Sequence, residues 1–309
     1  MSAAPVATAD EVVDEGQGAV YDLGYRPHDG IRLGRSGAFR AMMVDGTRRA
    51  LGLRRKPLAK VIPWGLIAAA IVPAAWIVGL TYVVSGFNLE DTGPWGDPAE
   101  YFEYIGLLTL LFVALTAPTL LIPDREHGVL AIYASRPVRA ADYLLARAAT
   151  LFGLTTLFML VPQLILYVGI SGLYVEGIGA GLVENGENLP ATLGTLLAFV
   201  FGFGGPAFLV ALFAKRLVIA SGVYVMVMML SLMLAETMPR ATELLVFKLL
   251  APLSLMGHPY SVRDWLFDQE AEGWALDRVG LPPWVAAAVI VGIVIAVGVL
   301  AHRRYRREF

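Results

Sequence analysis

Residues 61–84 read VIPWGLIAAAIVPAAWIVGLTYVV, a run of 24 residues without a charged side chain. Wound as an α-helix, this run would rise about 36 Å, which is enough to cross the roughly 30 Å hydrocarbon core of a bilayer. Pro63 and Pro73 lie inside it and predict a bend, because proline removes a backbone hydrogen bond and crowds the preceding turn. The run therefore predicts a transmembrane helix.

The two flanks of this run carry opposite charges. Residues 85–100, on the C-terminal side, hold acidic residues and no basic one. The N-terminal side holds the basic residues Arg48, Arg49, Arg54, Arg55, Lys56 and Lys60. Membrane proteins retain basic residues on the cytoplasmic side, so we expect this flank in the cytoplasm. The orientation of the chain in the membrane accounts for these basic residues, so they do not indicate a nucleic-acid partner.

Further apolar runs of similar length follow at 101–122, 143–171, 193–214, 217–235 and 282–301. The sequence of 309 residues is 57% hydrophobic and 16% charged, whereas about a quarter of a soluble domain is charged. This apolar excess predicts a lipid-facing surface. The expected fold class is an all-α polytopic membrane protein with six transmembrane helices.

The connections between the runs alternate in charge. Residues 172–190 contain only acidic charges, and residues 237–281 are net acidic. Basic residues gather in the remaining connections and at the C-terminus: Arg125, Arg136, Arg139, Arg147, Lys215, Arg216, Arg303, Arg304, Arg306 and Arg307. This alternation predicts that both termini are cytoplasmic. Arginine outnumbers lysine 20 to 4, a bias typical of GC-rich bacterial genomes, so we expect a bacterial plasma membrane protein.

Two segments outside the spans are also predicted to be helical. Residues 36–56 place Phe39, Met43 and Ala50 near helical spacing, which indicates an amphipathic helix in the cytoplasmic interface. Residues 244–256 are apolar but too short to cross a bilayer, and they predict extracellular re-entrant helices before the last span. The predicted domains are a disordered cytoplasmic tail at 1–35, the interfacial helix at 36–60, the six-helix transmembrane domain at 61–301 and a basic cytoplasmic tail at 302–309.

Several patterns typical of active sites do not occur in the chain. It has no G-x-x-x-x-G-K-[ST] phosphate loop, no H-E-x-x-H pair and no cysteine, so we expect no catalytic residue, metal site or cofactor. The glycine-rich residues 202–205 lie in a predicted span and indicate close helix packing. The ionisable residues Glu103, Arg147, Glu236 and Lys248 fall near predicted span ends. Ion-coupled transport needs charges at membrane depth, so any transport would draw its energy from a cytoplasmic partner.

One cytoplasmic segment could receive that energy: residues 123–147, PDREHGVLAIYASRPVRAADYLLAR. Asp124 is placed to cap a new helix after Pro123, Glu126 favours its first turn, and Pro137 would end it. This pattern predicts a short cytoplasmic helix between the second and third spans. Its exposed face would carry Val129, Ile132 and Tyr133.

This segment resembles the second intracellular region of the permeases of the ABC-2 (type V) exporter class, in particular their actinobacterial members. That region reads acid-base-acid-x-Gly-Thr-Leu, followed by Ser/Thr/Arg-Pro-Val and, ten residues later, a basic residue. Asp124 stands where glutamate is usual, and Val129 stands where threonine is usual. The matching residues are Asp124, Arg125, Glu126, Gly128, Leu130, Arg136, Pro137, Val138 and Arg147.

The resemblance implies the permease subunit of an ATP-driven exporter. It implies two copies of this chain, or this chain with a homologous permease, and a separate ABC ATPase subunit that binds ATP and Mg. It also implies a substrate path along the first, second and fifth spans, where Thr109, Thr116 and Thr119 are candidates, and outward export of a lipophilic drug, lipid or metabolite. The residues implied in coupling to the ATPase are Asp124, Arg125, Glu126, Gly128, Leu130, Tyr133, Arg136 and Pro137.

Two alternatives stay open at this point. An integral membrane enzyme acting on lipids would need a polar cluster near the interface, for which His258, Asp264 and Asp268 are scattered candidates. A membrane anchor without transport activity would need no coupling segment, and Arg125 and Arg136 would then serve only to orient the chain in the membrane.

Overall fold

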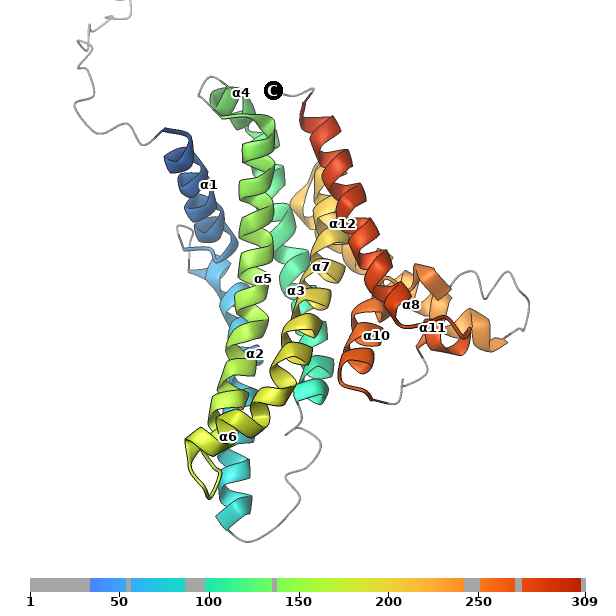
Figure 1. The fold of residues 1–309 in the computed structure, drawn as a ribbon. Helices are drawn as coiled ribbons and strands as arrows, with labels where there is room; N and C mark the ends of the chain where they lie inside the picture. Colours follow the sequence, from blue (N-terminus) through green and yellow to red (C-terminus); the bar gives the residue numbers. More distant parts are fainter. Residues whose placement is uncertain are drawn as a thin grey trace, which may run out of the picture. The chain divides into compact units, whose positions relative to one another are not determined.

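All regular structure in the described part of the chain is helical. The computed structural model describes residues 34–53, 57–86, 98–134, 138–241, 251–269 and 274–306, which belong to one unit that begins at Gly34. Figure 1 shows the order of the helices along the chain. Of the predicted tail at 1–35, residues 1–33 lie outside the described residues, whereas Gly34 and Arg35 already belong to the first helix. Residues 54–56, 87–97, 135–137, 242–250, 270–273 and 307–309 also lie outside the described residues.

Six of the described helices are long and apolar enough to span a membrane. They match the predicted spans to within a few residues at most ends, which confirms a multi-pass all-α membrane protein. Their bounds are α2 Leu58–Gly86, α3 Pro98–Glu126, α5 Ala140–Ser171, α7 Leu189–Phe213, α8 Leu217–Ala241 and α12 Trp284–Tyr305.

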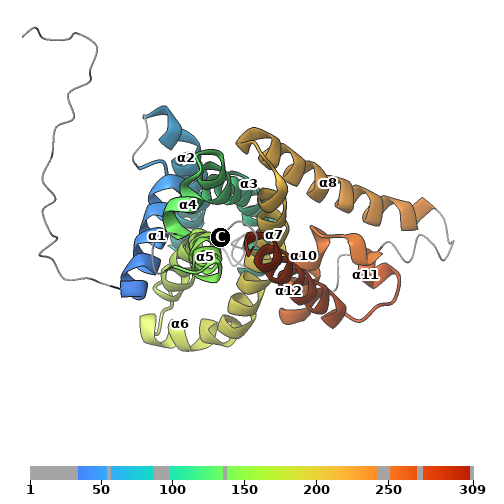
Figure 2. The same ribbon diagram turned by 90° about the horizontal axis from the view of Figure 1, so that it is seen from above.

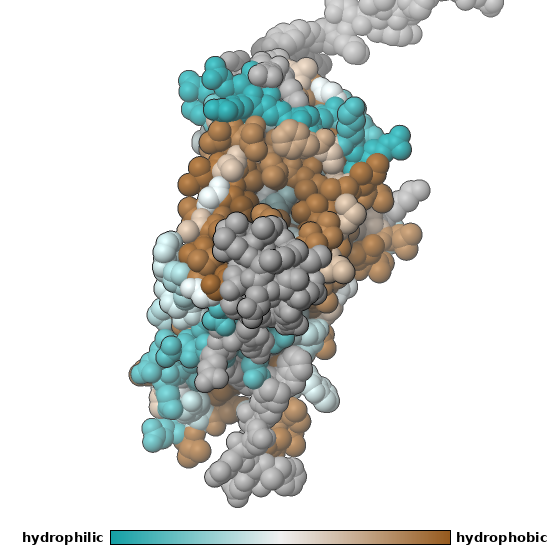
Figure 3. All heavy atoms as spheres, turned by 90° about the vertical axis from the view of Figure 1, so that its right-hand side faces the viewer, coloured by the Kyte–Doolittle hydropathy of each residue, from teal (hydrophilic) through white to brown (hydrophobic). Residues whose placement is uncertain are grey.

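The six helices differ in how much of their surface is covered. Helices α3 and α7 are mostly buried, and α7 packs against α3, α5 and α12. Helices α2, α8 and α12 are mostly exposed, and Figure 2 shows α2 and α8 on the outside of the group. Figure 3 shows the apolar side chains as a broad band next to a strongly polar end. These exposed apolar side chains are the lipid-facing surface that the composition predicted.

Glycines on α7 allow neighbouring elements to approach closely. A methyl group added at Gly202 would lie 2.6 Å from Pro259 Cγ, and one added at Gly204 would lie 2.7 Å from Phe152 Cε1. Both distances are too short for a side chain. The predicted packing role of residues 202–205 is therefore confirmed.

The same test predicts the effect of a substitution on α3. A methyl group at Gly106 would lie 2.8 Å from Phe199 Cε1 and would also collide with the Tyr260 hydroxyl. We expect Gly106→Ala to lower the free energy of unfolding by about 1–3 kcal/mol, because the core there is already filled. Gly79→Ala on α2 is the matched control, since its methyl group would meet no atom within 4 Å. Thermal unfolding in detergent measures both, and equal midpoints would contradict the prediction.

The helix before the first span is shorter than predicted. Helix α1 runs over Gly34–Ala50 and does not continue to residue 60. Gly52 ends it with a φ of 65°, while Leu53 N–H donates to the Arg48 carbonyl and Gly52 N–H to the Arg49 carbonyl. This pair of bonds is the Schellman arrangement that terminates helices. Helix α1 packs on α3 and α5.

Short helices precede the last span, as predicted. They are η3 Ala251–Leu253, α10 Gly257–Leu266 and α11 Ala275–Arg278, and α10 packs against α7 and α12. Helix α10 is too short to cross a bilayer. Of the predicted stretch 244–256, residues 244–250 lie outside the described residues.

Candidate functional site

A buried carboxylate at the end of α3 joins three helices. The Asp124 side chain is fully buried. Its Oδ1 accepts a hydrogen bond from Arg49 Nη1 of α1 at 2.5 Å, and its Oδ2 accepts one from Arg147 Nη2 of α5 at 2.6 Å. Tyr143 of α5 donates its hydroxyl to the same Oδ2 at 2.9 Å. This carboxylate therefore holds α1, α3 and α5 together.

A second carboxylate balances the two arginines. Asp45 Oδ2 of α1 lies 2.7 Å from Arg49 Nη2 and 3.6 Å from Arg147 Nη2. We call Asp45, Arg49, Asp124, Tyr143 and Arg147 the Asp124 network. Burial disfavours the charged form of Arg49, but its hydrogen bond to Asp124 and the nearby carboxylates outweigh this cost and raise the pKa of the guanidinium. The network thus pairs two acids with two bases, as buried charges require.

The local sequence lets α1 approach closely enough to form these bonds. A methyl group at Gly46 would lie 3.0 Å from Arg147 Nη1, so glycine leaves room for that guanidinium. Arg147 Nη1 also donates to the Met42 carbonyl at 3.1 Å. At the other end of α1, Arg35 Nε donates to Asp142 Oδ2 at 2.8 Å. Helix α1 is therefore fixed to the bundle at both of its ends.

Arg125 points away from the network, toward the end of α7. Its guanidinium donates to the carbonyl oxygens of Ala211, at 2.5 Å, of Leu212, and of Ala214, at 2.9 Å. The last carbonyls of a helix have no partner within the helix and carry the negative end of its dipole. Arg125 therefore joins α3 to the α7–α8 connection.

A short exposed helix follows these two anchored residues. Helix α4 spans Val129–Ala134, with Leu130 buried, Tyr133 half-buried and Ile132 58% exposed. Tyr133 packs against Tyr143 of the network, with 5.7 Å between ring centroids. Burial raises the pKa of Tyr133. The predicted short helix between the second and third spans is therefore present, with one side in the core and one side open.

The structure corrects how this helix begins. We predicted that Asp124 caps a new helix after Pro123, which is wrong, because α3 continues through Pro123 to Glu126. Gly128 interrupts the helix instead, because its φ of 65° is not a helical value. The physical reason is that Asp124 is committed to Arg49, Arg147 and Tyr143, and glycine adopts the left-handed conformation at low cost.

The predicted coupling residues thus separate into groups. Asp124, Arg125 and Leu130 make internal contacts, and Tyr133 is shared between core and surface. Glu126 and Gly128 are exposed beside α4. Arg136 and Pro137 lie outside the described residues.

The threonines predicted along a substrate path lie mainly inside the bundle. Thr109 and Thr116 are buried, and Thr109 Oγ1 donates to the Ile105 carbonyl at 2.8 Å. Thr119 is half-buried and donates to the Thr116 carbonyl at 2.7 Å. Within this chain, Thr119 alone of the three is partly accessible.

The ionisable residues near the span ends have different settings. Arg147 is fully buried two turns into α5, whereas Glu103 is exposed near the start of α3, 3.9 Å from Arg263. Lys248 and the side chain of Glu236 lie outside the described residues. Sequence reasoning placed Arg147 only at a helix end and missed its partners. One feature of the sequence could have drawn attention to Arg147: residues 148–171, which follow it in the same span, contain no charged residue.

The polar residues considered for a lipid enzyme make internal contacts on α10. His258 Nε2 lies 2.8 Å from the Pro252 carbonyl, and burial lowers its pKa although this bond opposes the shift. Asp264 Oδ1 is 2.6 Å from Arg263 Nη2, and both side chains are buried. Asp268, in contrast, is exposed just after α10. His258 Nε2 and Asp264 Oδ1 thus have partners within the chain.

Comparisons of the chain with models of known protein families and with curated proteins gave no match. The fold defines the class as a multi-pass membrane protein. A more specific function has to be argued from the site.

Proposed function

We propose that this chain is the transmembrane permease subunit of an ATP-driven ABC exporter of the ABC-2 class. It would act in a bacterial plasma membrane with both termini cytoplasmic. The chain itself would hydrolyse no ATP; a separate nucleotide-binding subunit would bind ATP and Mg and supply the force. The observation that carries the proposal is the exposed helix α4, which directly follows an α3 end that is bonded to α1, α5 and α7.

This arrangement suits the transmission of force. A partner that pushes on α4 would act on α3 through the short segment around Gly128. The Asp124 network would pass the movement to α1 and α5, and Arg125 would pass it to the end of α7. Charge-assisted hydrogen bonds are short and directional, so the joined helix ends would move together. The partner must contact the two transport states differently in order to shift them.

The exposed apolar helices support a lipophilic substrate. Trp76 of α2 and Met226 and Met233 of α8 are more than half exposed. Faces of this kind contact lipid, or a second copy of the chain or a homologous permease. A path between such faces would favour a hydrophobic drug, lipid or metabolite over a sugar polymer.

The test of this function uses the surface of α4. We expect Ile132→Asp to abolish the ATP turnover that the permease stimulates in its ATPase partner, because a charge would replace an apolar contact at the interface. Helix α4 is exposed there, so membrane insertion and thermal stability should stay close to wild type. The measurement is ATP hydrolysis by the complex purified from its native membrane and reconstituted in vesicles.

Val175→Asp is the matched control. Val175 is fully exposed in the connection after α5, remote in sequence from α4, so this variant should keep full stimulation. Normal stimulation in Ile132→Asp would remove α4 from the coupling role. The proposed function itself would be overturned if no P-loop ATPase co-purified with the chain, or if the purified chain alone transported a substrate.

A further inference from the structure

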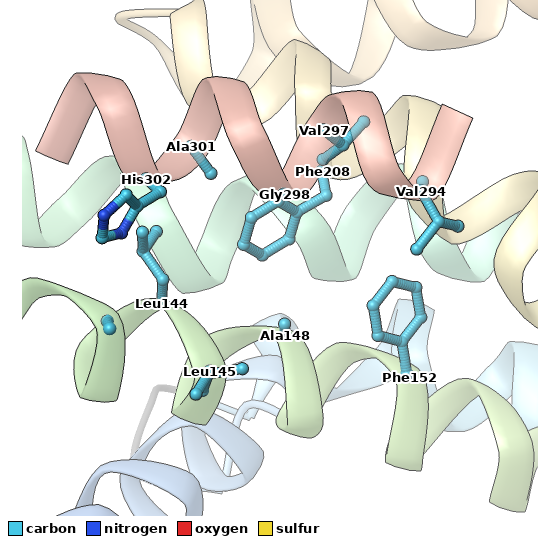
Figure 4. Close-up of a pocket in the computed structure, with 12 residues that line it drawn as sticks. Leu144, Leu145, Ala148, Phe152, Phe208, Val294, Val297, Gly298, Ala301 and His302 are labelled. Carbon is cyan, nitrogen blue, oxygen red and sulfur yellow. The ribbon is translucent and has the colours of Figure 1, made fainter. Parts of the chain in front are cut away.

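An apolar groove runs between α5, α7 and α12. It encloses about 370 Å³, and Figure 4 shows side chains from α5 and α12 facing each other across it. Its floor is buried and its rim, including Leu145, Gly298 and His302, is exposed. The floor residues are Leu144, Phe208, Val297 and Ala301.

The groove has the form of a slot for an alkyl chain. It follows α12 from Val294 to His302, a little over two turns or about 12 Å. Aliphatic and aromatic carbons make almost all of its lining, and Phe152 lies toward the end opposite His302 (Figure 4). The small residues Ala148 of α5 and Gly298 of α12 line the middle of the groove from its two sides.

A histidine and two arginines lie at the polar end of the groove. His302 lines the groove, Arg303 follows it in the last turn of α12, and Arg139 precedes α5. His302, Arg303 and Arg139 are exposed. The nearby carboxylate of Asp142 is already engaged by the Arg35 guanidinium at 2.5 Å. An anion at this end would therefore meet the charges of the two arginines without facing an unpaired acid from α5.

We propose that this groove binds one acyl chain of an anionic phospholipid, with the headgroup phosphate beside His302, Arg303 and Arg139. Bulk lipid tails are as apolar as the groove, so burial of the chain alone gives little selectivity. Selectivity comes from the charge at the end of the groove, where basic residues attract anionic headgroups. The lipid would fix the distance between α5 and α12 in the leaflet at the basic end. This inference does not depend on the transport function.

The test is photolabelling of the full-length purified protein in lipid nanodiscs. The probe is phosphatidylglycerol that carries a diazirine in one acyl chain, and labelled residues are mapped by peptide mass spectrometry. We expect labels to concentrate on α5 near Leu145–Phe152 and on α12 near 294–301. Equal labelling by the matching phosphatidylcholine probe, or labels spread evenly over α2 and α8, would overturn the proposal.

A pair of variants on α12 makes this test specific. Gly298 lines the groove, so Gly298→Phe would fill it, whereas Gly292 on the same helix is not among the lining residues and Gly292→Phe is the control. A Cβ atom added at either position meets no atom within 4 Å. We expect Gly298→Phe to lose the groove label and Gly292→Phe to keep it, with both variants unfolding at the wild-type temperature. Identical labelling of the two variants would show that the groove is not the site.

A second pair tests the headgroup contact. We expect Arg303→Gln to lower the preference for phosphatidylglycerol over phosphatidylcholine roughly fivefold, the effect of one basic residue near an anionic surface. Arg216→Gln, in the connection between α7 and α8 and not next to a groove residue in the chain, should leave the preference unchanged. An unchanged preference in Arg303→Gln together with Arg139→Gln would overturn the charge argument. Cross-links from Leu145 to a second copy of the chain would assign the groove to a dimer interface instead.

Discussion

Replacing Asp124 with alanine is expected to destabilise the protein by about 3–5 kcal/mol, because it leaves buried arginines without their counter-charge. Arg147 is fully buried, and Arg49 is only partly exposed. Both guanidiniums bond to this one carboxylate, at 2.5 and 2.6 Å. Asp45 is too far from Arg147, at 3.6 Å, to replace the lost hydrogen bond without movement of α1. The midpoint of thermal unfolding in detergent measures the loss.

Two further variants separate this explanation from a general effect of substitution. Glu187→Ala removes an exposed carboxylate and should change stability by less than about 0.5 kcal/mol. Asp124→Leu combined with Arg147→Met should cost clearly less than the sum of the two single changes, because the double variant leaves fewer unpaired buried charges. Additive losses, or an Asp124→Ala variant as stable as wild type, would show that the Asp124 network does not join the helices.

Replacing Arg125 with methionine is expected to cost about 2–4 kcal/mol, because hydrogen bonds to a charged group are the stronger kind. Three carbonyl oxygens at the end of α7 would lose their donor at once. The favourable charge at the negative end of that helix would be lost as well. We also expect amide hydrogen exchange to accelerate at residues 211–216, which measures local opening of this helix end.

Arg125→Lys is the informative comparison. Lysine keeps the positive charge but cannot present the planar fork that reaches several carbonyls together. Its stability should therefore fall between those of wild type and Arg125→Met. A methionine variant with wild-type stability and unchanged exchange at 211–216 would rule out Arg125 as a link between α3 and α7.

The spanning helices could be predicted from local sequence because insertion into lipid depends on each segment by itself. The predicted first span at 61–84 corresponds to α2, Leu58–Gly86, and the last at 282–301 to α12, Trp284–Tyr305. Helix ends were less predictable. Helix α1 ends at Ala50 because Gly52 adopts a positive φ. The sequence around Gly52 is rich in basic residues and did not indicate where the helix ends.

The short helix between the second and third spans was predictable in position, but the bonds next to it were not. The segment 123–147 was predicted to connect two spans through a short helix, and α4 lies there. Asp45 and Arg49, in contrast, are spaced four residues apart like any surface pair on a helix. Nothing local indicates that Arg49 reaches Asp124, which lies 75 residues further along the chain. The order Pro123-Asp124 is typical of a helix start and suggested a cap. In the structure Asp124 lies inside a continuous helix and binds Arg49 and Arg147.

The sequence alone determined that this is a six-span helical membrane protein, because hydrocarbon tolerates only apolar segments whose backbone bonds are satisfied internally. Which charges meet was decided by tertiary structure. Asp124 is buried because α1, α3 and α5 close around it. The hydrogen-bond donors that offset the cost of burying its charge come from Arg49 of α1 and Arg147 of α5. The groove between α5 and α12 has the same origin, since Ala148 and Gly298 form an opening only when their helices pack side by side.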